Sequence, residues 1–354
     1  MRILVTGHDG YIGTVLVPLF QRAGHEVVGL DSALYRDCTF GPPPPTLPEI
    51  LKDVRDVEVG DLEGFDAVVH LAAISNDPVG DLNPACTLDL NHGGTVHLAE
   101  TAKAAGVQRF LFSSSCSLYG AAGDEVLDEH AAFNPVTAYG WSKIHSEQDL
   151  STLADDRFSP VYLRNATAYG VSARLRGDLV VNNLTGYAVA TGEVRLRSDG
   201  TPWRPLVHIE DISRAFLLLA EADRNEIHDQ AFNVGQTSEN YRISDVAAIV
   251  EAAVADSRIT FAEDAGPDLR NYRIDCGKLE RLGFEPRWTV ATGVAELVAA
   301  YRREDLTVDM LEGSRLSRIR HVRELMSEGR LDDMLRWRTT PDPSTNLAVA
   351  ETDG

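Results

Sequence analysis

The chain has 354 residues, of which 44% are hydrophobic and 25% charged, a composition typical of a folded globular protein and not of a disordered or collagen-like chain. Its formal net charge of −21 argues against a nucleic-acid partner, because so acidic a surface repels phosphates, but leaves room for a local basic pocket. No apolar run approaches the roughly 20 residues that a membrane span requires, so we expect no membrane association. The four cysteines form no CxxC pair and no signal peptide precedes the first strand, which favours reduced thiols, no bound metal and a cytoplasmic location.

The first 165 residues alternate between short apolar segments and helical patterns. The apolar segments lack the strict alternation of a half-exposed strand, as expected when helices cover both faces of a parallel sheet. Repeated strand–helix units predict an α/β fold with a doubly wound parallel (Rossmann) sheet. The predicted strands are Arg2–Thr6, Glu26–Leu30, Val57–Val59, Ala67–Leu71, Arg109–Phe112 and Pro160–Leu163, and the predicted helices are Ile12–Ala23, Ala85–Ala105 and Ala138–Leu153.

From about residue 166 this regularity falls, and helical patterns alternate with short strands and loops. We expect a smaller C-terminal α/β lobe, interleaved with the first domain, that binds substrate. Its predicted helices are Val180–Thr191, Ile209–Ala222, Ile243–Ala255 and Val290–Arg303. The predicted divisions are 1–165 for the sheet domain, to which later segments return, 166–304 for the lobe, 305–338 for an appended amphipathic helix and 339–354 for a loose tail.

A glycine-rich turn directly follows the first strand and opens a helix. Gly7, Gly10 and Gly13 follow the spacing GxxGxxG, looser than the general GxGxxG fingerprint, and allow a sharp turn while a diphosphate approaches the backbone. Asp31 ends the second strand, where an acid accepts hydrogen bonds from the adenosine ribose and repels a 2′-phosphate. We therefore predict that the first domain binds NAD rather than NADP.

Tyr139 and Lys143 lie four residues apart, on one face of a predicted helix. A phenol with a pKa near 10 is a poor base at neutral pH, but a neighbouring ammonium and a nicotinamide cation both favour the phenolate. The pair can then move a proton to or from a substrate hydroxyl while hydride passes to or from the nicotinamide. YxxxK is common by chance, but here it follows a fifth strand that ends in a serine-rich segment, 113–120, where a hydroxyl can hydrogen-bond the reacting oxygen.

Together these segments resemble the extended short-chain dehydrogenase/reductases of the NAD-dependent epimerase/dehydratase family, which act on nucleotide sugars. The resemblance spans about residues 1–300, and its motifs include TGHDGYIG (6–13), HLAAIS (70–75), SSSCSLYG (113–120) and YGWSK (139–143). It implies that Ser115, Tyr139 and Lys143 are the catalytic residues and that NAD stays bound. The expected cofactor contacts are Gly7, Gly10, Tyr11, Ile12, Gly13, Asp31, Asp61, Leu62, Leu71, Ala72, Ala73, Asn91, Ser113, Tyr139 and Lys143, although Asp61 and Leu62 could equally form a plain turn.

The resemblance also implies where a nucleotide-diphosphate sugar binds. Arg204 and Arg270 match family arginines, and bidentate guanidinium groups suit a diphosphate. Thr167 stands where the family usually has Asn, which leaves the sugar's identity open. Family members commonly pair the helices that match 85–105 and 138–153, so we expect a homodimer. The expected substrate contacts are Ser75, Ser115, Cys116, Thr167, Asn183, Arg204 and Arg270.

The residues after Ser115 bear on the type of reaction. Family dehydratases carry an acid pair there, whereas this chain has Cys116 and Ser117. We therefore predict an NAD-dependent nucleotide-sugar epimerase that inverts C4 through a transient 4-keto sugar. The alternatives are a dehydratase or decarboxylase that uses Cys116 as an acid, and a keto-sugar reductase that consumes NAD(P)H. A noncatalytic dinucleotide-sensing protein on the same fold is a further alternative, but such proteins commonly lose the Tyr or Lys retained here.

Overall fold

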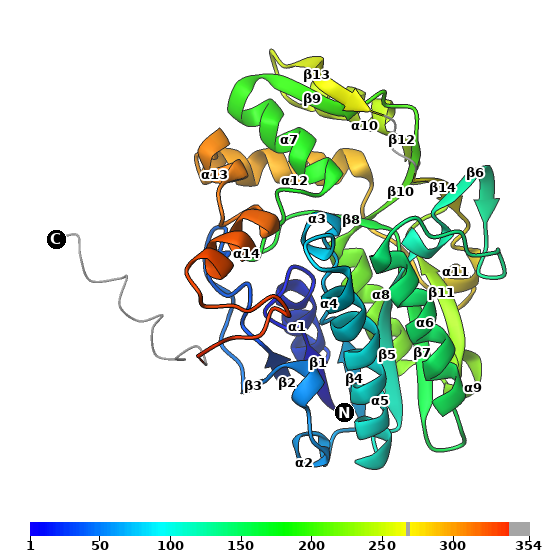
Figure 1. Cartoon of the computed structure of the whole chain (residues 1–354). Coiled ribbons are helices and arrows are strands. Elements are labelled where there is room, and N and C mark those ends of the chain that lie inside the picture. The colour runs from blue at the N-terminus through cyan, green and yellow to red at the C-terminus, as the bar shows by residue number, and fades with distance from the viewer. Residues whose placement is uncertain (267–269, 340–354) are drawn as a thin grey trace.

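The computed structural model describes residues 1–266 and 270–339 of the chain. Its centre is a seven-stranded sheet in the order β11-β7-β5-β4-β1-β2-β3, in which every neighbouring pair is parallel (Figure 1). The central strands are buried on both faces, which explains their continuous apolar sequences. The strands are β1 (Arg2–Thr6), β2 (Glu26–Asp31), β3 (Glu49–Leu51), β4 (Ala67–His70), β5 (Arg109–Ser115), β7 (Ser159–Asn165) and β11 (Gln230–Val234).

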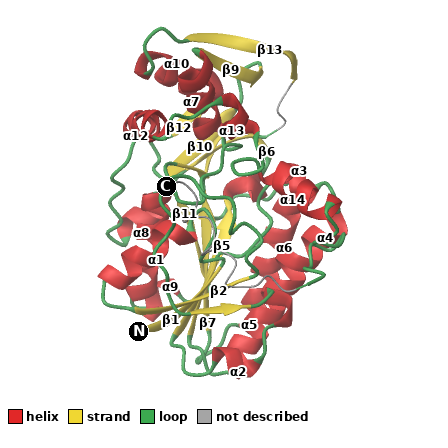
Figure 2. Cartoon of the chain, turned by 90° about the vertical axis from the view of Figure 1, so that its left-hand side faces the viewer, coloured by secondary structure: helices red, strands yellow, loops and turns green. Residues whose placement is uncertain are grey.

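Helices cover both faces of this sheet, as Figure 2 shows. α1 (Gly13–Arg22) and α8 (Ile209–Glu221) pack together on one face. α5 (Gly94–Ala104) and α6 (Ala138–Leu153) cover the other face, where Leu98 is fully buried. The prediction of a doubly wound parallel sheet is therefore confirmed.

The winding direction reverses at β1, whose two neighbours are β2 and β4. In such sheets, ligands bind beyond the carboxyl ends of the strands at this reversal. The glycine-rich turn leaves β1 at this point, and the serines that end β5 reach the same edge. The sheet thus brings the predicted cofactor-binding and catalytic residues to one edge.

A smaller lobe lies beyond this edge, at the top of Figure 1. Its three main helices enclose a second apolar core, separate from those of the sheet. β11 comes later in the chain than several elements of the lobe, yet it pairs with β7 in the main sheet, so the two parts interleave as predicted. The lobe contains α7 (Val180–Thr191), α10 (Ile243–Ala253), α12 (Val290–Arg303), the sheet β12 (Asn240–Arg242), β10 (Trp203–His208) and β8 (Thr167–Tyr169), and the pair β9 (Glu193–Ser198) and β13 (Arg258–Gly266).

Short elements complete the described chain. They are the helices α2 (Val59–Leu62), α3 (Asp77–Gly80), α4 (Pro84–Leu88), α9 (Arg224–Ile227), α11 (Gly277–Arg281), α13 (Val308–Glu312) and α14 (Arg318–Ser327), and the strands β6 (Ala121–Leu127) and β14 (Asn271–Ile274), which pair with each other.

Among the described residues, no helix has both the length and the apolar character needed to cross a bilayer.

Three predicted elements differ from the structure. Residues 57–59, predicted as the third strand, lie between a 3₁₀ turn and α2, and the third strand is the edge strand β3. The single helix predicted over 85–105 is divided by a π-helical turn, Asp89–Gly93, that separates α4 from α5. The appended segment contains two short helices, α13 and α14, instead of one. The tail predicted for 339–354 lies, from residue 340 onward, outside the described residues.

Candidate active site

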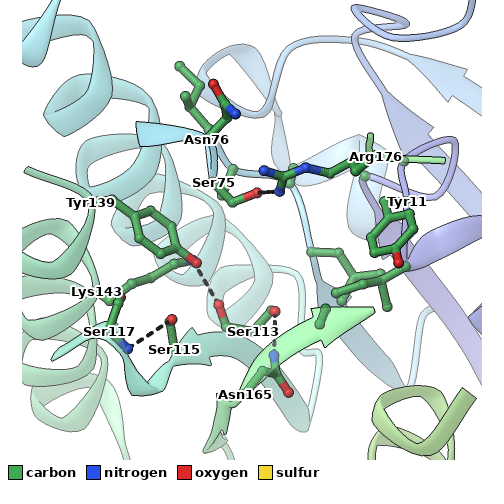
Figure 3. A pocket seen from close by; sticks show the side chains of 18 of the residues that line it. Tyr11, Ser75, Asn76, Ser113, Ser115, Ser117, Tyr139, Lys143, Asn165 and Arg176 are labelled. Atoms are coloured by element: carbon green, nitrogen blue, oxygen red, sulfur yellow. Dashed lines mark hydrogen bonds between the residues drawn. The ribbon is translucent and has the colours of Figure 1, made fainter. Parts of the chain in front are cut away.

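One large cavity lies at the carboxyl edge of the sheet, between the sheet and the smaller lobe. Figure 3 shows Tyr139 and the serines of β5 on one side of it, and Tyr11 and Arg176 on the other. The following residues predicted for the site line the cavity: Gly7, Gly10, Tyr11, Ile12, Gly13, Asp31, Leu71, Ala72, Ala73, Ser75, Ser113, Ser115, Tyr139, Lys143, Thr167, Arg204 and Arg270.

The glycine-rich turn leaves no room for side chains at two of its glycines. Gly7 has a φ of +70°, and a Cβ there would lie 2.7 Å from the backbone nitrogen of Ala72. A Cβ at Gly13 would collide with the carbonyl oxygens of Gly7 and His8. Glycine at these positions lets α1 begin close to the sheet with its N-terminus toward the cavity, which is the arrangement that receives a dinucleotide diphosphate.

Asp31 is held in place at the end of β2. One carboxylate oxygen accepts a hydrogen bond from the backbone nitrogen of Ala33 at 2.8 Å, and the other accepts one from that of Asp9 at 3.2 Å. Burial raises the pKa of Asp31, while the nearby His8 and these backbone donors oppose that shift. The carboxylate lines the cavity, so it can receive the ribose hydroxyls as predicted.

Tyr139 is placed by the first turn of α6. The Thr137 side chain accepts a hydrogen bond from the Gly140 nitrogen at 3.1 Å and so caps this helix one residue before it begins. Burial raises the pKa of Tyr139 to about 12, although a hydrogen bond from Ser115 favours the phenolate. The phenol is therefore protonated at neutral pH in the protein alone.

Lys143 lies one helical turn further on and is only 2% exposed. Its Nζ donates to the Ser113 carbonyl oxygen at 2.7 Å and lies 5.4 Å from the centre of the Tyr139 ring. Burial lowers the pKa of Lys143 to about 7, and the Glu147 carboxylate opposes part of this shift. The sequence predicts that the ammonium of Lys143 favours the phenolate of Tyr139. Because burial penalises the charged forms of both side chains, Lys143 alone does not bring the pKa of Tyr139 below its usual value.

Arginines predicted for a diphosphate lie at the opposite end of the cavity. Arg204 is buried, and its Nη1 donates to the carbonyl oxygens of Trp203 and Arg270. Arg270 Nη1 forms an ion pair with Asp77 at 2.9 Å. The cavity therefore has a cationic end in the smaller lobe, within a protein whose overall charge is strongly negative.

The structure does not bring five predicted residues to the cavity wall: Asp61, Leu62, Asn91, Cys116 and Asn183. Asp61 pairs with Lys52 at 2.7 Å, whereas Leu62 is fully buried beside it. The third strand was predicted too late in the chain, and Asp53 and Val54, which follow the observed β3, line the cavity where Asp61 and Leu62 do not. A correct placement of β3 would have drawn attention to Asp53 and Val54.

The other three have structural roles. Asn91 exchanges hydrogen bonds with the backbone of Ile74, at 2.8 and 2.9 Å, and so fixes the cavity-lining segment after β4. Asn183 donates to the Gly177 carbonyl oxygen at 2.7 Å. Cys116 is fully buried behind the cavity, and its thiol donates to the Arg164 carbonyl oxygen at 3.0 Å. Burial raises the pKa of this thiol well above its usual value. Cys116 is thus a packed thiol and not one of the residues that line the cavity, where its contact with substrate was predicted.

Several further cavity residues were not predicted from the sequence. Arg176 reaches across the cavity to Ser75, with a hydrogen bond of 2.9 Å, and is paired with Asp178 (Figure 3). Tyr35 and Arg318 line the wall near Asp31. These residues come from loops and from the appended segment, where no local sequence motif marks them.

Comparison with known proteins identifies the family of this chain. Residues 3–235 match the model of the NAD dependent epimerase/dehydratase family. The chain belongs to the NAD-dependent epimerase/dehydratase family. A UDP-glucose 4-epimerase of Mycolicibacterium smegmatis is 30% identical over 316 residues, which cover 86% of this chain and 99% of that relative.

Solved structures similar to this chain include a protein bound to a UDP-sugar and NAD and a nucleotide-sugar dehydratase. MoeE5 in complex with UDP-glucuronic acid and NAD is 29% identical, with a TM-score of 0.74 and coverage of 86% of this chain and 99% of MoeE5. TunA, an NAD-dependent NDP-hexosamine 5,6-dehydratase, is 25% identical, with a TM-score of 0.76 and the same coverage. The family identifies an NAD-dependent enzyme, and the glycine-rich turn and Asp31, whose residue types suit that cofactor, line the same cavity.

Proposed function

We propose that this protein is a nucleotide-sugar 4-epimerase. The observation that carries the proposal is that Ser115, Tyr139 and Lys143 line one cavity in which the two positions after Ser115 offer no carboxylate. Ser117 lines the cavity and Cys116 is packed behind it. Inversion of a hydroxyl-bearing carbon needs a base and a hydride acceptor but no acid to expel water, so this set of residues is sufficient.

In the proposed reaction, Tyr139 removes the proton of the C4 hydroxyl and later returns it. Ser115 hydrogen-bonds the same oxygen, and Lys143 in its protonated form supplies positive charge beside the phenol. The glycine-rich turn and Asp31 would hold NAD, which would supply a reversible acceptor for the C4 hydride and a nicotinamide cation that favours the phenolate. Arg204 and Arg270 would hold the substrate diphosphate at the other end of the cavity.

Dehydration is the second candidate for two reasons. TunA, a dehydratase, is similar to this chain, and Asp77 is a carboxylate that lines the cavity and lies near enough to Tyr139 to raise its pKa. An eliminating enzyme needs a protonated acid to release hydroxide as water. Asp77 is engaged in an ion pair with Arg270 at 2.9 Å, a partner that such an acid would have to leave. The alternative that uses Cys116 as the acid is disfavoured because its thiol is packed behind the cavity.

A proton-NMR assay with UDP-, dTDP-, CDP- and GDP-sugars tests the proposal. We expect one sugar to convert to a stereoisomer, with no net release of NADH, because the hydride returns to the same carbon. An unsaturated or deoxy product would contradict epimerisation and favour elimination. Stoichiometric oxidation of added NADH would instead identify a reductase, and absence of turnover with every sugar, despite NAD binding, would favour a dinucleotide sensor.

We also propose that the enzyme is a cytoplasmic homodimer paired through α5 and α6. Trp141, on α6, is 48% exposed and would lie within this interface. The four cysteines are all free and buried, in keeping with a reducing compartment. Light scattering should give twice the chain mass; a monomer at micromolar concentration would contradict the dimer.

A further inference from the structure

The appended segment, residues 305–338, packs against the cofactor half of the cavity. Trp337 Nε1 donates to the Ser32 carbonyl oxygen at 2.7 Å. His321 Nε2 lies 2.8 Å from the Leu34 carbonyl oxygen, an acceptor, so this nitrogen carries the proton. Val322 and Leu325 share an apolar cluster with Leu34. The segment therefore fixes the loop that directly follows Asp31.

Arg318, the first residue of α14, lines the cavity wall and is 3% exposed. Its Nη2 donates to the Arg174 carbonyl oxygen at 2.7 Å, and its guanidinium lies 4.7 Å from the centre of the Tyr35 ring. Its Nη1 is buried and makes no hydrogen bond within the described residues.

Arg318 also differs from neighbouring buried arginines in its charge environment. Arg164 and Arg174 pair with Glu147 and Asp9, each at 2.7 Å, whereas Arg318 has no such ion pair among the residues that the structure describes. The Asp178 carboxylate, whose pKa Arg318 helps to lower, is itself paired with Arg176, so the charge of Arg318 is only partly compensated, and a buried cation loses its hydration at a cost. A bound anion in the cavity would supply the missing charge and an acceptor for Nη1.

We infer that Arg318 binds the diphosphate of NAD, so that the appended segment supplies part of the cofactor site. We expect the adenosine ribose of NAD at Asp31 and its nicotinamide half at Lys143. The diphosphate joins these two parts, so it must lie between the two residues, beside the glycine-rich turn. Arg318 is linked to that turn through Arg174, whose Nη2 pairs with Asp9 of the turn. The cations assigned to the substrate, Arg204 and Arg270, lie in the smaller lobe.

The assignment of Arg318 concerns a residue outside 3–235, the part of the chain that matches the family model. It is also independent of the reaction proposed above, because it concerns cofactor affinity, which can be measured without turnover.

Isothermal titration of the full-length chain, freed of bound nucleotide, tests the inference. Arg318→Gln should bind NAD and ADP-ribose about tenfold to a hundredfold more weakly, the usual effect of losing a charge-assisted hydrogen bond to phosphate, while adenosine affinity stays within about twofold. Arg318→Lys should fall between the wild type and Arg318→Gln. Arg320→Gln, on the same helix but with a side chain 62% exposed, is the matched control and should bind all three ligands normally.

Three outcomes would overturn the inference. The first is unchanged NAD affinity in a folded Arg318→Gln or Arg318→Lys protein. The second is an equal loss for adenosine and NAD, which would assign Arg318 a structural role in the ribose loop. The third is weakened NADP binding with normal NAD binding, which would point to a 2′-phosphate contact. Should Arg318→Gln fail to fold, the Arg318→Lys measurement with NAD and adenosine decides between these outcomes.

Discussion

Replacement of Tyr139 by Phe is expected to lower kcat about a thousandfold, within the range that general acid–base catalysis contributes. The phenol oxygen is the group next to Ser115 that can exchange a proton with a sugar hydroxyl, and Phe removes this oxygen while keeping the ring. The loss should fall on kcat, whereas NAD affinity should change less than about threefold, because the ring still packs beside Lys143.

The measurement compares turnover in the NMR assay with NAD affinity by titration, for Tyr139→Phe and for a control variant. Tyr241→Phe is a suitable control, since Tyr241 lies in β12, outside the cavity wall, and also uses its hydroxyl, which donates to Glu239 at 3.2 Å. Its kcat should stay within about twofold of the wild type. If Tyr139→Phe retained more than a tenth of the activity, another group would have to be the base.

Strong local signals allowed much of the fold to be predicted from the sequence. β1 and α6 have the predicted bounds, because an uninterrupted apolar run marks a doubly covered strand and Thr137 caps the helix. β3 was missed because it is a three-residue edge strand that is only partly buried, so its sequence carries little hydrophobic signal. The error also left Asp53 and Val54, which follow β3 and line the cavity, out of the expected cofactor contacts.

The site was predictable where residues follow a strand end, and not where the tertiary structure brings in distant loops. Ser115 could be placed at the cavity because it ends β5, but the chain then turns into a short 3₁₀ helix, Cys116–Tyr119, in which Cys116 is buried in the core while Ser117 lines the cavity. Arg176 and Arg318 depend on how loops and the appended segment fold back over the sheet edge. No motif near either residue indicates that contact.

A buried ion pair joins the elements that carry the proposed catalytic residues. Glu147, one turn after Lys143 on α6, pairs with Arg164 of β7, and the closest of their hydrogen bonds is 2.7 Å. The Ser114 hydroxyl donates to the same carboxylate at 2.5 Å. Ser114 stands between Ser113, which accepts from Lys143, and Ser115, which bonds Tyr139. The pair therefore connects α6, β5 and β7 at the point where they carry the site.

Glu147→Gln should lower the free energy of unfolding by about 3–5 kcal/mol, because it leaves the guanidinium of Arg164 buried without an opposing charge. Urea denaturation measures this loss. Asp149→Asn is the matched control on the same helix; its pair with His92 is half exposed, so the change should be below about 1 kcal/mol. The double variant Glu147→Leu/Arg164→Leu should recover part of the lost stability, since it removes both charges. A loss below about 1 kcal/mol in Glu147→Gln would mean that the pair contributes little, and the rigidity of Ser115 would then need another source.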